Sequence, residues 1–259
     1  MKIYTYYQKL DTEDLKSEDQ SELIDLWKIS WSRQGYEPIV LNLEDAKKHS
    51  YFETLNSEMR RIFKEITNKE ISDYGMSCWF RWLAYATQAD EKFYVSDYDA
   101  INVNFPITEP NEKLHLMDYA CPFLASGTPT QFQNLCKAFV KISNERIQIL
   151  KQQANHYHDQ EFFQYNLMPE YNDSAEELRN KYEILMTRKR REIGGFYDPR
   201  SKTFFSGPRF DPINIKDYKV AHIAHYNVRL ILDKYPELSK KYSDQKYRII
   251  MIKDILSIK

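Results

Sequence analysis

The alternation of strand and helix patterns at the start of the chain is the strongest constraint on its fold. A β-rich run at residues 2–7 is followed by residues 21–31, whose apolar side chains recur at helical spacing, and by a second β-rich run at 36–42. Gly35 is placed to end the helix. A strand, a helix and a strand in this order form a right-handed βαβ unit. We therefore expect an α/β fold with a mixed, mostly parallel central sheet flanked by helices.

Strand and helix patterns continue along the rest of the chain. Residues 51–66 and 76–86 have helical patterns, and the apolar run 93–95 indicates a buried strand. Further along, we expect helices at 131–140, 144–153 and 173–193, one or two C-terminal helices within 230–259, and strands within 114–124 and 218–226. Because no internal repeat or low-complexity linker divides the chain, we expect a single domain over residues 1–259.

Composition excludes several classes of protein. The chain has 37 Lys and Arg against 38 Asp and Glu, so its net charge of -1 gives no general attraction to nucleic acid or anionic membranes. Three cysteines without a CxxC spacing indicate neither a disulfide framework nor a cysteine zinc site. Residues 1–10 contain no apolar signal segment, and no apolar run approaches the length of a transmembrane segment. We expect a soluble, cytoplasmic protein.

Two aspartates follow the buried strand at 93–95. Asp97 and Asp99 are separated by one residue, and residues i and i+2 of a strand point to the same side. Such a pair of carboxylates suits a hard divalent cation, and ligands of open α/β sheets bind where strands end. The three residues 97–99 taken alone fit a polar turn equally well, because short motifs have many false positives.

Arg81 lies in a segment, 76–86, that is apolar on nearly every side and is therefore expected to be buried. A buried guanidinium is costly unless a carboxylate or a phosphate pairs with it. We favour an ion pair with an aspartate of the 97–99 loop over a direct phosphate contact. Both interpretations place Arg81 at the same site as Asp97 and Asp99.

Three further groups of residues are candidates for the site. The small-residue segment 125–129 contains Ser126 and Gly127, where a ligand can approach the backbone closely, although an ordinary turn explains it as well. His222 and His225 lie in the strand expected at 218–226 and meet at one site if that strand ends near residue 224. Asp159 stands at a helix start, where it is either a helix cap or a catalytic carboxylate.

In their order along the chain, these elements resemble the A-type glycosyltransferase fold (GT-A). The resemblance extends from Lys2 to about Tyr226. It is strongest at 78–86 followed by 94–102, and at 222–225. The stretch 27–41 also looks like the opening of uncharacterised bacterial and viral members of this superfamily. The resemblance implies a Rossmann-like sheet with a nucleotide-sugar-binding half at 1–105, an acceptor and metal-completing half at 106–228, and a C-terminal helical extension at 229–259.

The resemblance also implies a function, transfer of a sugar from a nucleotide-diphosphate donor to a hydroxyl acceptor. In the family a divalent cation, here Mn²⁺ or Mg²⁺, stabilises the diphosphate leaving group. The family pattern places Asp99 on the metal, Asp97 on the ribose or a water, and a late-strand histidine on the metal, of which we prefer His225 to His222. The donor is expected to be a UDP-sugar, and the acceptor a glycan, a lipid-linked group or a protein.

The resemblance assigns the remaining candidates to the donor and to catalysis. Tyr6 and Tyr7 are donor-site candidates, because early-strand residues contact the nucleotide base in the family, and residues near Arg81 join them. Asp159 is the candidate general base of an inverting enzyme. His158 and Glu161 compete with it for that role.

Two other classes of function stay open on the sequence. Aspartates and histidines also build the two-metal sites of phosphodiesterases and nucleases, which predicts a second carboxylate cluster. The chain is alternatively a non-catalytic relative that binds a sugar nucleotide or a glycan, because a fold does not guarantee chemistry.

Overall fold

The computed structural model describes residues 1–10, 20–117, 123–154, 156–187, 196–198, 203–206, 211–213 and 219–257. Its centre is a six-stranded sheet in the order β2-β1-β3-β6-β5-β7. The strands are β1 (Lys2–Tyr6), β2 (Glu37–Leu41), β3 (Phe93–Ser96), β5 (Leu114–Leu116), β6 (Leu124–Gly127) and β7 (Ile184–Met186). Only β6 runs antiparallel to its neighbours, so the expectation of a mixed, mostly parallel sheet in an α/β fold is confirmed.

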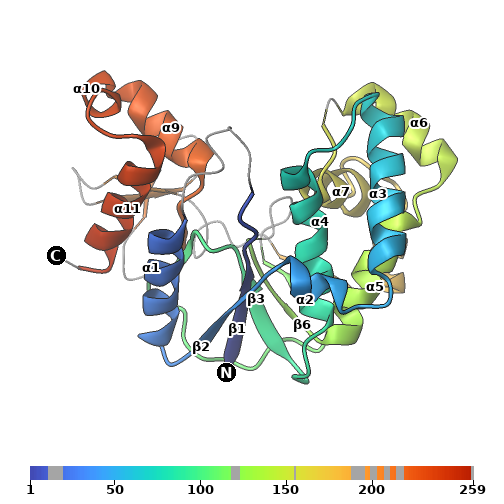
Figure 1. Ribbon diagram of the computed structural model, residues 1–259, viewed down its shortest axis with the longest axis horizontal. Helices are drawn as coiled ribbons and strands as arrows, with labels where there is room; N and C mark the ends of the chain where they lie inside the picture. Colours follow the sequence, from blue (N-terminus) through green and yellow to red (C-terminus); the bar gives the residue numbers. More distant parts are fainter. Residues whose placement is uncertain are drawn as a thin grey trace.

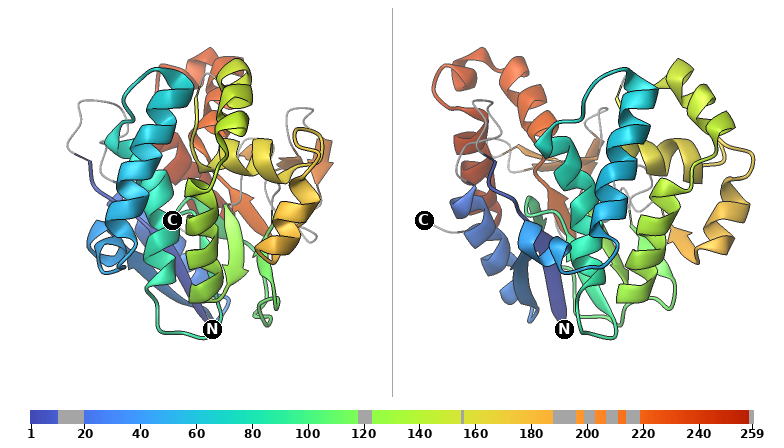
Figure 2. Two further views of the ribbon diagram at one scale, coloured as in Figure 1. Left: turned by 90° about the vertical axis from the view of Figure 1, so that its right-hand side faces the viewer. Right: turned by 45° about the vertical axis from the view of Figure 1, so that its right-hand side comes forward.

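Helices cover both faces of this sheet. One group consists of α1 (Ser21–Ser32), α9 (His225–Lys234), α10 (Pro236–Ser239) and α11 (Asp244–Ile255). The other consists of α2 (Leu43–Lys47), α3 (Phe52–Thr67), α4 (Asp73–Ala86), α5 (Pro129–Val140), α6 (Asn144–Gln153) and α7 (Asp159–Leu167), and is followed by α8 (Ala175–Lys181). Figure 1 shows the two groups on opposite sides of the strands. In Figure 2 the orange-to-red C-terminal helices lie beside the blue α1, far along the chain from it.

The alternation of side chains along β1 and β3 explains the two layers. Successive residues of a strand point to opposite faces. Ile3 and Tyr94 accordingly belong to the hydrophobic core under α1, α9 and α11. Tyr4, Phe93 and Val95 belong to the core under the α2–α7 group. Both faces of the central strands are therefore buried, as a mostly parallel sheet requires.

Smaller sheets lie outside the central one. β4 (Ala100–Asn102) pairs antiparallel with β11 (Val220–His222) and so brings the late histidine segment beside the end of β3. A three-stranded sheet contains β8 (Phe196–Asp198), β9 (Thr203–Ser206) and β10 (Asp211–Ile213). No helix among the described residues is long and apolar enough to cross a membrane.

Three expectations from the sequence are wrong in detail. The helix expected at 173–193 ends at Lys181, and β7 follows it at 184–186. The strand expected within 114–124 is shorter: β5 ends at Leu116, and a separate strand, β6, begins at Leu124. The segment 125–129 is not a loop, because residues 125–127 belong to the buried strand β6 and Pro129 starts α5. Ladder pairing and burial in the cores outweigh the turn preference of these small residues.

The late strand is also shorter than expected. β11 ends at His222, and residues 225 onward form α9 rather than more strand. His222 and His225 therefore lie on different elements, and each has its own surroundings. The basic run at 188–191 and the glycines 194–195 fall outside the described residues.

Candidate functional site

The turn that carries the two aspartates is fixed by backbone hydrogen bonds. The N–H of Asp97 donates to the carbonyl of Phe123 (2.9 Å), and the N–H of Ala100 donates to the carbonyl of Asp97 (3.0 Å). On the other side, the N–H of Ile223 donates to the carbonyl of Asp99 (2.9 Å). The turn is thus tied to the residue before β6 and to the residue after β11, and its position depends on the sheets rather than on the turn itself.

Two tryptophans of α1 form hydrogen bonds to the residues on either side of the same turn. Trp27 and Trp31 are one helical turn apart and fully buried. The indole N–H of Trp27 donates to the hydroxyl of Ser96 (2.9 Å), and that of Trp31 donates to the carbonyl of Ala100 (3.0 Å). The Trp-x-x-x-Trp spacing therefore brackets the aspartates at both ends, a role that the sequence does not reveal.

Asp97, Asp99 and His222 converge on one point, with one ligand atom from each lying within 4.8 Å of the others. The Nε2 atom of His222 lies 3.4 Å from Oδ1 of Asp99 and 3.9 Å from Oδ2 of Asp97. The imidazole stacks on Phe123 with ring centroids 4.4 Å apart. Of the two histidines, the structure places His222 in this cluster, whereas the sequence interpretation preferred His225.

Arg81 forms the expected ion pair with the aspartate turn. Its Nη1 atom lies 2.5 Å from Oδ1 of Asp97, so the prediction of an ion pair with this turn is confirmed. The same guanidinium binds Asp159, with Nη2 and Nε at 2.6 and 2.9 Å from Oδ2. One partly buried cation on α4 therefore joins the end of β3 to the start of α7.

Arg248 holds the second aspartate and was not identified from the sequence. Its side chain is fully buried, and Nη2 lies 2.6 Å from Oδ2 of Asp99. Its Nε atom donates to the carbonyl of Ile223 (2.8 Å), and Nη1 lies 2.9 Å from Nε2 of His225. Arg248 is one of several charged residues in α11, and no pattern in that helix distinguishes it from a solvated arginine.

Each aspartate binds an arginine with one carboxylate oxygen, and its other carboxylate oxygen faces His222. Burial and the neighbouring Asp99 raise the pKa of Asp97, although Arg81 opposes this. Burial also disfavours the anionic form of Asp99, but His222 and Arg248 outweigh it and hold the pKa of Asp99 well below its ordinary value. Two carboxylate oxygens and one imidazole nitrogen form a donor set that fits a divalent metal ion.

A small cavity adjoins the turn. It has a volume of about 90 Å³ and is lined by Tyr6, Tyr7, Gln8, Leu10, Gln20, Tyr74, Ser77, Tyr98 and His225. The rings of Tyr7 and Tyr98 meet edge to face with centroids 5.7 Å apart. Both predicted tyrosines therefore line the same cavity as the middle residue of the aspartate turn, and Tyr7 contacts that residue. A larger cavity of about 610 Å³ has its lining on α5–α8 and their connections, and none of the predicted site residues lines it.

Two other candidates lie away from the cluster. Ser126 and Gly127 pair with Tyr94 and Phe93, and because β6 is antiparallel to β3 they lie toward the start of β3, opposite the aspartate end. Ser126 is also completely buried. The register thus separates both residues from the aspartate turn.

Asp159 is brought to the cluster but is fully engaged. Its side chain is 4% exposed. Oδ2 accepts from Arg81 and from the indole of Trp82 (2.7 Å), and Oδ1 accepts from the N–H of Gln160 (2.9 Å). This arrangement makes Asp159 the counter-ion of Arg81.

A family model described as a domain of unknown function (DUF8765) matches residues 1–99, less than half of the chain. Comparison with curated proteins gave no match. Among solved structures, the chain is similar to one described as the crystal structure of a glycosyltransferase involved in the glycosylation of the major capsid of PBCV-1. The two are 11% identical, with a TM-score of 0.44 over 97% of this chain and 98% of that one.

Proposed function

We propose that the chain is a metal-dependent glycosyltransferase that moves a sugar from a nucleotide-diphosphate donor, a UDP-sugar, to a hydroxyl acceptor. The observation that carries the proposal is the pair of carboxylate oxygens, from Asp97 and Asp99, that face His222 beside a tyrosine-lined cavity. This arrangement stands at the end of a central strand, where α/β sheets place their ligands. It agrees with the GT-A resemblance of the sequence.

In this proposal Asp97, Asp99 and His222 hold Mn²⁺ or Mg²⁺. Such a cation supplies compensation for the negative charge that develops on a diphosphate leaving group. Arg248 keeps Asp99 ionised and fixed in orientation. Arg81 orients Asp97 and adds positive charge beside the same site. Tyr6 and Tyr7, which line the adjoining cavity, are assigned to the nucleobase side of the donor.

Asp159 has two candidate roles that a variant separates. As a general base it would deprotonate the acceptor, and Asp159→Asn would lower kcat by at least about 100-fold with donor affinity unchanged. The hydrogen bonds of Asp159 favour the other role, in which it is the counter-ion of Arg81. In that case the same variant would leave the side chains of Arg81 and Asp97 less firmly oriented. The Kd for Mn²⁺ and nucleotide would then rise together with the loss of kcat. We propose the positioning role, and an unchanged donor Kd would contradict it.

A two-metal phosphodiesterase is less well supported. The two metal ions of such an enzyme lie about 3.5–4 Å apart, so the ligands of one ion must lie directly beside those of the other. In the described part of the chain the other group of metal-type ligands is His156, His158 and Glu161, which shares no residue with the aspartate cluster. A non-catalytic binder of sugar nucleotides has the same site and differs only in turnover.

The test is thermal unfolding of the full chain with Mn²⁺ and UDP, GDP or CMP. Specific binding stabilises the native state by about 2.7 kcal/mol at a ligand concentration of 100 Kd. We expect UDP with Mn²⁺ to raise Tm, Asp99→Asn to remove the effect, and Asp25→Asn, at an exposed position on α1, to keep it. A chain that no nucleotide stabilises in the presence of metal would refute the proposal. Hydrolysis or transfer of UDP-sugars then separates an enzyme from a binder.

A further inference from the structure

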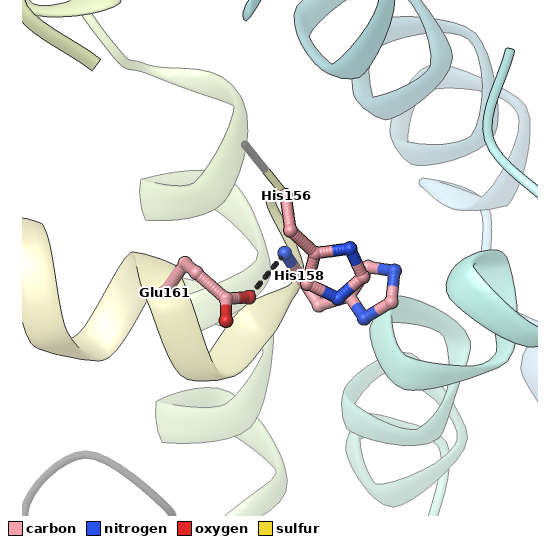
Figure 3. Close-up of side chains that lie close together, drawn as sticks. All are labelled: His156, His158 and Glu161. Carbon is pink, nitrogen blue, oxygen red and sulfur yellow. Dashed lines mark hydrogen bonds between the residues drawn. The ribbon is translucent and has the colours of Figure 1, made fainter. Parts of the chain in front are cut away.

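A second group of metal-type ligands lies at the start of α7, where the proposed transferase chemistry gives it no role. His156, His158 and Glu161 each offer one ligand atom, and the three atoms lie within 4.8 Å of one another. Figure 3 shows the three side chains together, all from the segment that leads into α7 and its first turn. Glu161 and His158 are partly buried, and His156 is exposed.

Glu161 is held in place before any ligand binds. Its Oε2 atom accepts a hydrogen bond from the backbone N–H of His158 at 2.7 Å, the dashed line in Figure 3. This bond orients the carboxylate toward the segment that carries both histidines. Such outer contacts strengthen a metal site because they fix a ligand's orientation in advance.

The two imidazoles are packed unusually closely. Their ring centroids are 3.8 Å apart, whereas aromatic pairs usually lie about 4.5–7 Å apart. Their planes are inclined at 64°, so the rings meet edge to face and both belong to one compact group of ring nitrogens. A metal ion bound by one ring nitrogen of each histidine would hold the two imidazoles together at this short separation.

His158 is fixed on its other sides. Its ring stacks on Phe63 with centroids 6.2 Å apart and planes at 20°. On α4, a Cβ atom at Gly75 would lie 2.9 Å from Nε2 of His158, so the glycine leaves room for the imidazole. His158 and Glu161 are therefore the rigid part of the group, and the exposed His156 is the part that can adjust.

We propose that His156, His158 and Glu161 form a binding site for a divalent transition metal of the zinc class, separate from the aspartate cluster. Two imidazoles and one carboxylate are a common zinc donor set, with a fourth position left for water. At bond lengths of about 2.0–2.1 Å, tetrahedral ligands lie about 3.4 Å apart. Rotation of the exposed His156 side chain can bring its nitrogen closer to the other two ligand atoms. The proposal does not rest on the transferase activity.

The site has a structural consequence for α7. Asp159 lies between the ligands in sequence and binds Arg81, which binds Asp97. A metal at the three ligands fixes the first turn of α7 and so the position of Asp159. Occupancy of this site therefore stiffens one side of the aspartate cluster without contacting it.

The experiment measures Zn²⁺ affinity of the full chain by competition with a chromophoric chelator, and Co²⁺ binding by its visible absorption. The variants are His156→Ala, which removes an exposed ligand, and Glu161→Gln, whose amide oxygen can still accept from the N–H of His158. Gln160→Ala, an exposed non-ligand of the same turn, is the matched control. We expect the first two variants to weaken Zn²⁺ binding by at least about 10-fold and the control to leave it unchanged.

The same titration in Asp99→Asn separates the two sites. Zn²⁺ binding that persists there and is lost on adding His156→Ala assigns the metal to the α7 site. Zn²⁺ affinity and Co²⁺ absorption that are unchanged in His156→Ala would overturn the proposal, as would a wild-type chain that binds Zn²⁺ only through Asp99. Mn²⁺ affinity of His156→Ala reports on the aspartate cluster separately, so failure of this proposal and of the transferase proposal are distinguishable.

Discussion

Two arginines from opposite layers of the fold each hold one aspartate of the cluster. Arg81 comes from α4, and its side chain is 18% exposed and divided between Asp97 and Asp159. Arg248 comes from α11, and its side chain is completely buried and bound to Asp99. The first arginine serves two carboxylates with one charge, whereas the second pairs with one carboxylate and bonds to neutral groups.

This difference makes the two aspartates unequal. Where one cation serves two carboxylates, burial prevails and the pKa of Asp97 is raised. Where the arginine and His222 face one carboxylate, the pKa of Asp99 is lowered despite burial. Asp99 is therefore the stronger acid of the pair, and Asp97 is the weaker one. The comparison also shows that the C-terminal helix is part of the site.

Removal of Arg248 is expected to have the largest effect. Arg248→Met keeps most of the packing but leaves Asp99 buried without its cation, which typically costs about 3–5 kcal/mol. The free energy of unfolding, from urea titration, measures the loss. Arg248→Met combined with Asp99→Asn removes both charges and should recover part of the stability. A double variant as unstable as the sum of the singles would show that the two residues are not coupled.

Replacement of Arg81 should cost less. Arg81→Lys keeps the charge, but an ammonium lacks the planar fork that reaches Asp97 and Asp159 together. We expect a loss of about 1–3 kcal/mol in the free energy of unfolding, the net cost of one or two charged hydrogen bonds. The Kd for Mn²⁺ should rise as Asp97 loses its orientation. A loss equal to that of Arg248→Met would contradict the difference drawn between the two arginines.

The sequence predicted the half of the site that has a local signature. Asp97 and Asp99 follow an apolar strand at a spacing of two, and Arg81 is conspicuous because its neighbours are apolar. Strand and helix patterns likewise predicted β1, α1, β2 and the α3–α6 helices, because each buries a regular face. These features depend on periodicity within one element, which a single sequence contains.

The rest depends on contacts between distant elements. Arg248 resembles a surface arginine until α11 packs against the residues after β11, and only that packing brings it to Asp99. The small residues of β6 favour a turn locally, but burial between two cores makes them a strand. The choice of His222 over His225 follows from where β11 ends, and boundaries of short strands are weakly encoded.

The pH dependence of stability tests the neutral partner of Arg248. Burial and the charge of Arg248 lower the pKa of His225 from 6.5 to about 4, although Asp99 opposes this. Below about pH 6.5 the unfolded chain takes up a proton that the folded chain does not, so stability is full above that pH and falls as the pH falls toward 4. At pH 5 the loss from this group is about 1–2 kcal/mol.

His225→Gln isolates this contribution. The glutamine amide can still accept a hydrogen bond from Nη1 of Arg248 but does not titrate. The difference in unfolding free energy between pH 7 and pH 5 should therefore be smaller in the variant than in the wild type. Equal differences in the two proteins would mean that His225 titrates alike in both states, and that Arg248 does not hold it neutral.

The exposed contact of α11 should have the smallest effect. Lys253 of α11 lies 2.7 Å from Glu22 of α1, but the two side chains are 38% and 50% exposed. Ion pairs of this kind contribute about 0.2–1 kcal/mol and are screened by salt. Lys253→Ala should therefore change the free energy of unfolding by at most about 1 kcal/mol, and by less in 1 M salt. A loss that approaches that of Arg248→Met would mean that the exposed ion pair, and not the buried arginine, holds α11 against the rest of the fold. The buried arginine would then no longer explain why the C-terminal helix belongs to the site.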